Sequence, residues 1–506
     1  MTGQREDIDK LLTSASLVFV GLAVDSVASL VERVVIGRAL SPAAYGDVNI
    51  GLAVLVLGTT LGQIGLHKGV ARYIPRYDDE ADVRGVWVSG LVATAVTSTV
   101  IAAVLLLNVD LVAGRLFESP RAVELLFLLF LSIPLEALLI LGVSAIQGLE
   151  NTRYMLYVQK LLYPISRIGL IAAFLWAGFD IVAVGYAYLL SLSVALVVAY
   201  LLLNRLVPLL GPFRLHLREL VRFSLPLVLS GLLVHLLTRT DTLMLGYFRT
   251  SFEVGLYSAA YPLAHAMMIV HAAFGFLFLP VASRLDAEGR REGVDEIFKL
   301  TTKWIYVTTF PAFLAFLVFP GDVIAVFFGE EYTAGALALA ILSAGFFVRA
   351  FNGRNREALA ALGNTTYILL GTSTAFVVNV VANLLLIPPF GIEGAAVASA
   401  ISFVLLNVII TGILWWSFDV SPFSWVGSRA YVLLPVALLP PAYLLSGFLT
   451  LTPLTLVPFL VVVGLFTLVV TGLAGSIQPE DAILIEFVEE RIDIEIPFVR
   501  RFIPTE

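Results

Sequence analysis

The sequence predicts an all-α membrane protein that crosses the bilayer many times. Of its 506 residues, 59% are hydrophobic and 14% are charged, whereas a soluble protein carries roughly 25% charged residues. The apolar residues form long continuous runs, and a helix needs about 20 of them to cross the hydrocarbon core. Strands of a membrane barrel would alternate instead. A soluble enzyme, a disordered scaffold and a nucleic-acid binder are therefore disfavoured.

Fourteen runs are long enough to be transmembrane helices. The first run follows ten polar residues, has no clear small-residue cleavage site and continues into Glu32 and Arg33. We therefore expect a span there and not a cleaved signal peptide. The expected spans are 11–31, 48–66, 86–107, 122–146, 155–178, 181–203, 223–246, 254–282, 301–319, 333–351, 364–386, 394–416, 429–448 and 453–474.

The distribution of lysine and arginine predicts the orientation. With the N-terminus in the cytoplasm, 24 of the 31 basic residues fall on the cytoplasmic side, five fall outside and two lie within spans. Cytoplasmic loops carry such an excess, so we expect a multi-pass cell-membrane protein with both termini in the cytoplasm. The polar interruptions reach only about twenty residues, which argues against a membrane glycosyltransferase or polymerase with a large catalytic domain.

The composition leaves little scope for a metal site, and we expect no catalytic residue and no bound cofactor. The chain has no cysteine, which removes disulfides, thiolate-bound metals and thiol catalysis. Its five histidines are scattered along the sequence.

The two halves of the chain resemble each other at an offset of 209 to 213 residues. Gly46 matches Gly255, and the segment 148–154 matches 361–367. Six spans precede the linker and six matching spans follow it, so both halves enter the membrane from the same side, as in parallel transporter repeats. The expected domains are a six-helix lobe at 1–203, an amphipathic cytoplasmic linker at 204–222, a second six-helix lobe at 223–416, an appended helix pair at 429–474 and an amphipathic cytoplasmic tail at 475–506.

The linker carries its own charge pattern. Arg214, Arg218 and Arg222 recur every four residues, which predicts one stripe of a helix on the anionic inner membrane surface. A solvated connector is the alternative.

Several motifs carry a family resemblance. They are the stretch from Arg222-Phe223-Ser224-Leu225-Pro226 through Asp241-Thr242-Leu243-Met244-Leu245-Gly246 to Tyr261, the segment Leu40-Ser41-Pro42-Ala43-Ala44-Tyr45-Gly46, Gly363-Asn364-Thr365, and Gly391-Ile392-Glu393-Gly394. With these motifs and its 6+6+2 spans, the whole chain resembles the polysaccharide transporter (Wzx-type) family. That family belongs to the multidrug/oligosaccharidyl-lipid/polysaccharide (MOP) flippase superfamily.

The resemblance implies a V-shaped pair of lobes around a central cavity that opens alternately to each side. Members move lipid-linked sugars, bridged by phosphate or pyrophosphate, from the cytoplasmic to the outer leaflet. They make and break no bond, so we do not expect an enzyme. A cation-coupled multidrug exporter of the same superfamily is the alternative function, and a passive scaffold in a glycan-assembly complex also stays open.

Charged residues within spans are candidates for function, because each costs about 2.5–3.5 kcal/mol on insertion scales. Arginine offers paired donors that stay protonated, which suits a lipid phosphate. The expected headgroup contacts are Arg33, Arg167 and Arg239. The residues expected to balance them, or to carry a coupling H⁺ or Na⁺, are Asp25, Glu32 and Asp241.

Each of these assignments has a structural alternative. Arg33 and Asp241 lie near the outer ends of their spans and could snorkel to the interface. Arg167 and Asp25 lie deeper, where a structural ion pair is the alternative. The histidines at 235, 265 and 271 are expected to be packed and hydrogen-bonded side chains rather than proton carriers.

The resemblance also implies partners, and the composition indicates a source. The expected partners are a lipid-linked glycan, membrane lipids and glycan-assembly enzymes, without nucleic acid. The chain has 26 arginines against 5 lysines and a net charge of −7. This acidic, lysine-poor balance favours a salt-adapted archaeal source and hence a dolichol-type carrier lipid.

Overall fold

The structure is a computed structural model that describes residues 21, 24–478 and 481, without the side chains at 226, 229, 230, 276 and 277. Every regular element in this described part is a helix, as the sequence predicts. Residues 24–39 are helical and form the described part of the first expected span. The rest of that span and nearly all of the expected amphipathic tail lie outside the described residues.

The chain divides into two compact units, one formed by residues 1–259 and 383–392 and the other by 260–382 and 393–506. We call them unit 1 and unit 2. Besides 24–39, unit 1 contains α2 (Pro42–Gln63), α3 (Leu66–Tyr73), η1 (Ile74–Arg76), α4 (Glu80–Leu107), α5 (Val109–Leu116), α6 (Ala122–Gly148), α7 (Thr152–Leu156), η2 (Tyr157–Leu162), α8 (Tyr163–Trp176), α9 (Val182–Leu206), α10 (Leu217–Phe248) and the first half of α11 (Ser251–Ala266). Unit 2 contains the rest of α11, α12 (Met268–Ala287), α13 (Arg291–Val318), α14 (Pro320–Phe327), η3 (Glu330–Gly335), α15 (Ala336–Phe351), α16 (Asn355–Ala361), most of α17 (Thr365–Phe418), α18 (Trp425–Leu445) and α19 (Pro453–Leu473).

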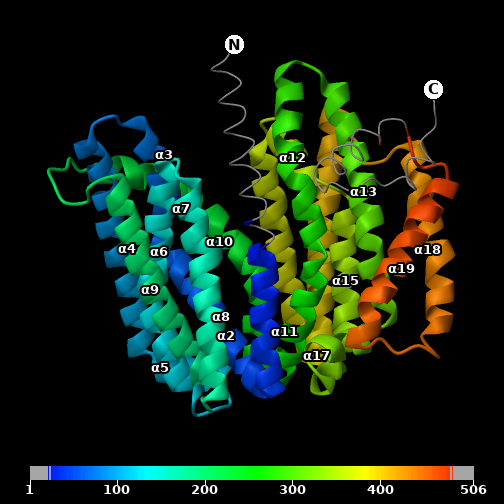
Figure 1. Cartoon of the computed structure of the whole chain (residues 1–506), viewed down its shortest axis with the longest axis horizontal. Coiled ribbons are helices and arrows are strands. Elements are labelled where there is room, and N and C mark those ends of the chain that lie inside the picture. Colours follow the sequence, from blue (N-terminus) through cyan, green and yellow to red (C-terminus); the bar gives the residue numbers. More distant parts are fainter. Residues whose placement is uncertain (1–20, 22–23, 479–480, 482–506) are drawn as a thin grey trace. The chain divides into compact units, whose positions relative to one another are not determined.

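Ten helices in the described part are long and apolar enough to cross a membrane, or eleven if the bent pair Ser251–Gly275 and Phe278–Ala287 is one span. The class of polytopic helical membrane protein is therefore confirmed, whereas the count of fourteen spans is not. One reason lies in α17, which runs through both expected spans 364–386 and 394–416 with a non-helical Gly391 between them. Helices α18 and α19, which overlap the stretch 429–474, lie side by side in unit 2 (Figure 1).

Helix α2 begins and ends where its sequence directs. Ser41 caps it by accepting a hydrogen bond from the Ala44 amide at 3.4 Å, and Pro42 follows at the first helical position. Its end is set by Ile64 and Gly65, both in the left-handed conformation.

Helices α2 and α11 cross within unit 1 at two glycines that the internal repeat relates. A Cβ atom on Gly46 would lie 1.8 Å from the Ser251 carbonyl oxygen, and one on Gly255 would lie 1.8 Å from the Pro42 carbonyl oxygen. At the offset of 209 residues Gly46 corresponds to Gly255 and Pro42 to Ser251. Each contact is therefore the counterpart of the other, and the crossing is reciprocal, as at a local two-fold axis. The Ser251 hydroxyl donates to Asp47 Oδ1 at 2.5 Å beside it. Only glycine allows backbones to approach this closely.

The linker between α9 and α10 is not the helix that the arginine spacing predicts. Residues 207–216 are non-helical and Arg214 precedes the start of α10, so the three arginines do not form one helical stripe. The linker instead lies against α4, where Arg84 Nε donates to the Pro212 carbonyl at 2.9 Å. A Cβ atom on Gly85 would lie 1.6 Å from the Arg214 carbonyl oxygen.

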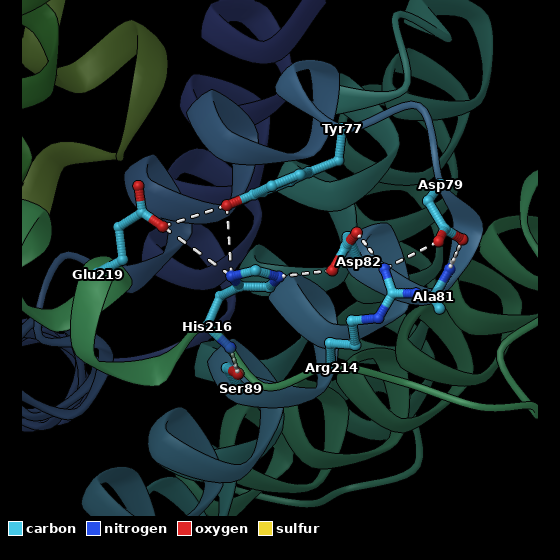
Figure 2. A network of polar contacts seen from close by, with 8 residues as sticks. All are labelled: Tyr77, Asp79, Ala81, Asp82, Ser89, Arg214, His216 and Glu219. Atoms are coloured by element: carbon cyan, nitrogen blue, oxygen red, sulfur yellow. Dashed lines mark hydrogen bonds and ion pairs between the residues drawn. The ribbon is translucent and has the colours of Figure 1, made fainter.

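Polar side chains complete this attachment (Figure 2). Arg214 donates to Asp79 at 2.9 Å and to Asp82 at 2.8 Å. The His216 ring stacks on Tyr77 with 4.6 Å between centroids, and its Nε2 lies 3.0 Å from Asp82 Oδ1. The backbone N–H of Ala81 and the Arg214 guanidinium hold the pKa of Asp79 below its usual value. Residues 207–216 of the linker are thus fixed to the first turns of α4, and we call this segment the strap.

A second difference concerns the expected span 333–351. In unit 2 the candidate span extends past residue 351. Helix α15 ends there, the chain turns at residues 352–354, where Gly353 has φ +57°, and α16 continues to Ala361. Arg349, Arg354 and Arg356, which the charge distribution assigns to the cytoplasmic side, therefore lie within the candidate span Glu330–Ala361.

The segment after α19 is anchored to α13 by buried charges. Lys303 Nζ donates to Asp481 Oδ2 at 2.6 Å and to the Ser476 carbonyl at 2.9 Å. The Trp304 indole N–H donates to the other Asp481 oxygen at 2.7 Å. Because both charges are almost fully buried, each depends on the other.

Candidate substrate-binding pocket

Unit 1 encloses a polar pocket of about 180 Å³ among its helices. The segment 24–39 and helices α2, α6, α8, α9 and α10 supply its walls. Its charged and aromatic lining residues are Glu32, Arg33, Tyr45, Glu136, Arg167, Tyr188 and Arg239. The sequence-predicted residues Arg33, Arg167, Arg239 and Glu32 thus meet in one pocket, although they come from three separate helices.

Arg167 is held by an ion pair and two aromatic rings. Its Nη2 donates to Glu32 Oε2, and the hydroxyl of Tyr188 donates to the other Glu32 oxygen at 2.8 Å. The guanidinium lies over the ring of Tyr163 at 4.6 Å and over that of Tyr188 at 4.7 Å. Glu32 is buried and both of its oxygens have partners, so the Arg167 side chain has a fixed position.

The other two predicted acids lie apart from these pocket residues. Asp25 forms an ion pair with Lys160 at 2.9 Å and is about half exposed. Asp241 is buried and accepts hydrogen bonds from Tyr257 and Asn383, each at 2.7 Å. It therefore does not snorkel, because its partners are protein groups.

A second cavity of about 290 Å³ adjoins the first. Val56 and Glu136 line both cavities, and Glu136 Oε2 accepts a hydrogen bond from Thr59 at 2.9 Å. The further polar lining consists of Thr60, Gln63, His67, Lys68 and His235. Two polar cavities that share part of their lining thus lie inside unit 1.

The histidines differ in their surroundings. His271 in unit 2 is buried, and its Nε2 lies 2.8 Å from the Gly353 carbonyl oxygen, which confirms the expected hydrogen-bonded packing. His265 stacks on Tyr261. His235 instead lines the second cavity of unit 1. In the described part of the chain, no group of three or more acidic or histidine side chains is arranged to hold a metal ion.

The sequence-based prediction missed the tyrosines. Tyr45, Tyr163 and Tyr188 surround the charged groups but come from three helices, so no local spacing joins them. The available signal was the presence of a hydroxyl-bearing aromatic within apolar spans, because a buried tyrosine O–H usually needs a partner.

The fold and the pocket define a class: a polytopic membrane transporter with a charged interior compartment. Residues 11–286, more than half of the chain, match the family described as "Polysaccharide biosynthesis protein". The chain belongs to this family, the Wzx-like flippases of the MOP superfamily. These are flippases and transporters and not enzymes.

Individual relatives match over shorter stretches. The chain is 27% identical over 192 residues to the "probable low-salt glycan biosynthesis flippase Agl15" of Haloferax volcanii, which covers 38% of this chain and 41% of that protein. It is 24% identical over 172 residues to the "probable flippase AglR" of the same organism, covering 33% and 36%. The matches thus span about two fifths or less of these relatives.

Solved structures share the fold over most of the chain. The lipid II flippase MurJ in an inward closed conformation aligns with a TM-score of 0.71 at 12% identity, covering 90% of this chain and 98% of MurJ. An inward-facing multidrug transporter of the MATE family aligns with a TM-score of 0.67 at 17% identity, covering 78% and 94%. At these identities the likeness concerns the fold alone.

Proposed function

We propose that the chain is a flippase that carries a lipid-linked oligosaccharide, joined to an isoprenoid phosphate or pyrophosphate, from the cytoplasmic to the outer leaflet by alternating access. The observation that carries the proposal is the meeting of Arg33, Arg167 and Arg239 in one pocket of unit 1. A phosphate that leaves water needs charged donors, and arginine supplies them in pairs without losing its proton.

The three arginines differ in role. Arg167 is fixed by Glu32 and by the rings of Tyr163 and Tyr188, so it offers a preorganised charge. Arg33 and Arg239 bring two further positive charges to the same space. Glu32 balances Arg167 while the pocket is empty, and an arriving phosphate competes with that carboxylate for the guanidinium.

Asp25 and Asp241 belong to the proposal in a more limited way. Asp25 balances Lys160, and Asp241 holds Tyr257 and Asn383. Either carboxylate would carry a coupling H⁺ or Na⁺ only by giving up these partners.

The second cavity suits the sugar part of the cargo. Its threonine, glutamine and histidine side chains offer both donors and acceptors, as sugar hydroxyls require. The multidrug-exporter alternative shares the fold, but three arginines in the pocket favour an anionic cargo over a cationic drug. The proposal includes a cell-membrane location with both termini in the cytoplasm and the glycan-assembly enzymes as partners.

The test is deletion of the gene, followed by mass spectrometry of lipid-linked glycans and surface glycoproteins. We expect lipid-linked glycan to accumulate and surface proteins to be underglycosylated. Arg167→Ala and Arg239→Ala should fail to restore glycosylation, whereas Arg121→Gln should restore it, because Arg121 pairs with Asp180 on the exposed surface. Unchanged glycans together with new sensitivity to cationic drugs would favour the exporter instead.

A further inference from the structure

Unit 2 contains an arginine cluster at a break within a candidate span. Helix α15 ends at Phe351, the chain turns through residues 352–354 and α16 begins at Asn355. Gly353 adopts φ +57° at the turn, where a Cβ atom would lie 2.0 Å from Thr302 Oγ1. Irregular backbone at membrane depth is tolerated where protein or a water-filled cavity surrounds it, and such breaks often form binding sites.

Buried polar groups fix the shape of this turn. His271 of α12 directs Nε2 at the Gly353 carbonyl, at 2.8 Å, so that nitrogen carries the proton. Its Nδ1 is then an acceptor and lies 2.6 Å from Arg354 Nη1, which also donates to the His271 carbonyl at 3.0 Å. The histidine is therefore neutral, and it holds Arg354 without balancing its charge.

The neighbouring side of the turn is tied to α17. Asn355 Nδ2 donates to Asn407 Oδ1 at 3.1 Å and to Thr411 Oγ1 at 3.0 Å. The Thr411 hydroxyl donates to Asn352 Oδ1 at 2.9 Å. Both ends of the break are thus held by neutral groups, and the arginines around it have fixed backbone positions.

The charges around this turn do not cancel. Arg349 lies in the last turn of α15, Arg354 in the turn itself and Arg356 in the first turn of α16, so three guanidiniums gather around one break. In the described part of the chain, one carboxylate forms an ion pair with this cluster. Glu357 Oε1 lies 2.9 Å from Arg354 Nη2. Arg349 and Arg356 are half-buried at either side of the turn. With three guanidiniums and one carboxylate, the described cluster has an excess of two positive charges within a candidate span, where charges are normally paired.

We propose that Arg349 and Arg356, positioned by the turn that Arg354 and His271 hold, form an anion site in unit 2 for a phosphate group. A phosphomonoester or phosphodiester supplies one or two negative charges and several acceptor oxygens, which matches two guanidiniums. The group comes either from a lipid headgroup or from soluble phosphate. This site lies wholly in unit 2 and does not rest on the function proposed for the pocket of unit 1.

The test uses the full chain purified in detergent micelles, with phosphatidic acid and inorganic pyrophosphate as separate probes. Native mass spectrometry follows phosphatidic acid adducts, and calorimetry follows pyrophosphate. In an Arg33→Gln/Arg239→Gln background, which disables the pocket of unit 1, adding Arg349→Gln/Arg356→Gln should weaken phosphatidic acid binding at least about tenfold. The same loss for pyrophosphate would identify soluble phosphate as a ligand, and loss for phosphatidic acid alone would identify a lipid headgroup.

The matched control is Arg290→Gln/Arg291→Gln in the same background. It removes two positive charges from exposed positions of unit 2 and should leave binding within about twofold. If Arg349→Gln/Arg356→Gln does not fold, Arg349→Lys/Arg356→Lys keeps the charge, removes the paired donors and should show an intermediate loss. Unchanged binding of both probes in a folded variant would overturn the proposal and leave the function proposed for unit 1 intact. Weaker binding in the Arg349→Gln/Arg356→Gln variant, together with unchanged glycans in the deletion strain, would support the anion site of unit 2 and contradict the function proposed for unit 1.

Discussion

Helix α6 of unit 1 and the α15–α16 segment of unit 2 occupy matching places in the internal repeat but differ in charge and continuity. At the offset of 213 residues, Glu136 of α6 corresponds to Arg349 of α15. Helix α6 runs unbroken for 27 residues, and Glu136 accepts a hydrogen bond from Thr59. The matching segment breaks three residues after Arg349, and Arg354 and Arg356 follow within the next seven residues.

This difference teaches that the repeat preserves a charged position within a span but not its sign or its partners. In unit 1 the buried Glu32 pairs with Arg167, and Glu136 accepts from the Thr59 hydroxyl. In unit 2 the cluster at the break keeps an excess of positive charge. The two units therefore share a framework and differ in the chemistry that they present.

The largest effect is expected from the ion pair of unit 1. Arg167→Met alone leaves Glu32 buried without its cation, which should lower the free energy of unfolding by about 3–5 kcal/mol. The double variant Arg167→Met/Glu32→Leu removes both charges and should recover most of that stability, because a buried ion pair can often be replaced by apolar groups. We expect it to fold but not to transport. Thermal unfolding in detergent and mass spectrometry of surface glycans measure the two properties.

The double variant separates structure from function. A folded protein that restores normal glycosylation would show that Arg167 and Glu32 serve the fold alone. Failure of the double variant to regain stability would show that Tyr188, which also donates to Glu32, depends on the charge of the carboxylate.

The next effect concerns the reciprocal glycine crossing of unit 1. Gly46→Ala places a methyl group 1.8 Å from the Ser251 carbonyl oxygen, and the obstacle is backbone that cannot rotate away. We expect a loss of about 2–3 kcal/mol, at the upper end of overpacking, and a similar loss for Gly255→Ala because the contact is symmetric. Gly114→Ala is the control, since nothing lies within 4 Å of its added methyl. Unequal losses for the two glycines would argue against a symmetric crossing.

The sequence was sufficient for the fold class and for four charged residues of the pocket, because both depend on local features. A continuous apolar run predicts a spanning helix wherever its partners lie, and arginine within such a run is unusual by itself. Arg33, Arg167, Arg239 and Glu32 were found in this way and lie in one pocket.

Partners and breaks could not be predicted in the same way. The pairing of Arg167 with Glu32 joins residues 135 positions apart, and nothing in their spacing favours it over pairing with Asp25. The turn at Gly353 depends on His271 and Thr302, which lie on other helices. The prediction of a helical stripe at Arg214, Arg218 and Arg222 is wrong because Arg84 of α4 hydrogen-bonds the linker backbone. This tertiary contact overrides the helical periodicity.

A smaller effect tests the break in unit 2. Gly353→Ala combines a left-handed backbone with a methyl group 2.0 Å from Thr302 Oγ1. Gly363→Ala shares the left-handed backbone, but nothing lies within 4 Å of its methyl. We expect about 1 kcal/mol of lost stability for Gly363→Ala from backbone strain, and about 1 kcal/mol more for Gly353→Ala from the contact. Equal losses would mean that the turn does not pack against Thr302 in the folded protein.

The smallest effect is expected at the exposed strap of unit 1 (Figure 2). Arg214→Gln removes the ion pairs to Asp79 and Asp82 but leaves the hydrogen bonds from Arg84 to the linker carbonyls. Global stability should hardly change, because exposed ion pairs contribute little. Amide hydrogen exchange of residues 207–216, followed by mass spectrometry, should nevertheless be faster. Arg205→Gln, an exposed change at the end of α9 just before the linker, should leave the exchange unchanged.

The pH dependence of this exchange shows whether the ionised Asp79 carboxylate stabilises the strap. The pKa of Asp79 is lowered in the folded protein, first by the Ala81 N–H and then by Arg214. The stabilisation from Asp79 is therefore fully present above its unfolded-state pKa of 3.8 and is lost as the pH falls through the lower folded-state value. Wild type and Arg214→Gln should differ most near neutral pH and converge on acidification. High salt should narrow the difference at neutral pH as well, because these charges are exposed to solvent. A difference that survives both acid and salt would mean that Arg214 holds the strap by packing and not by charge.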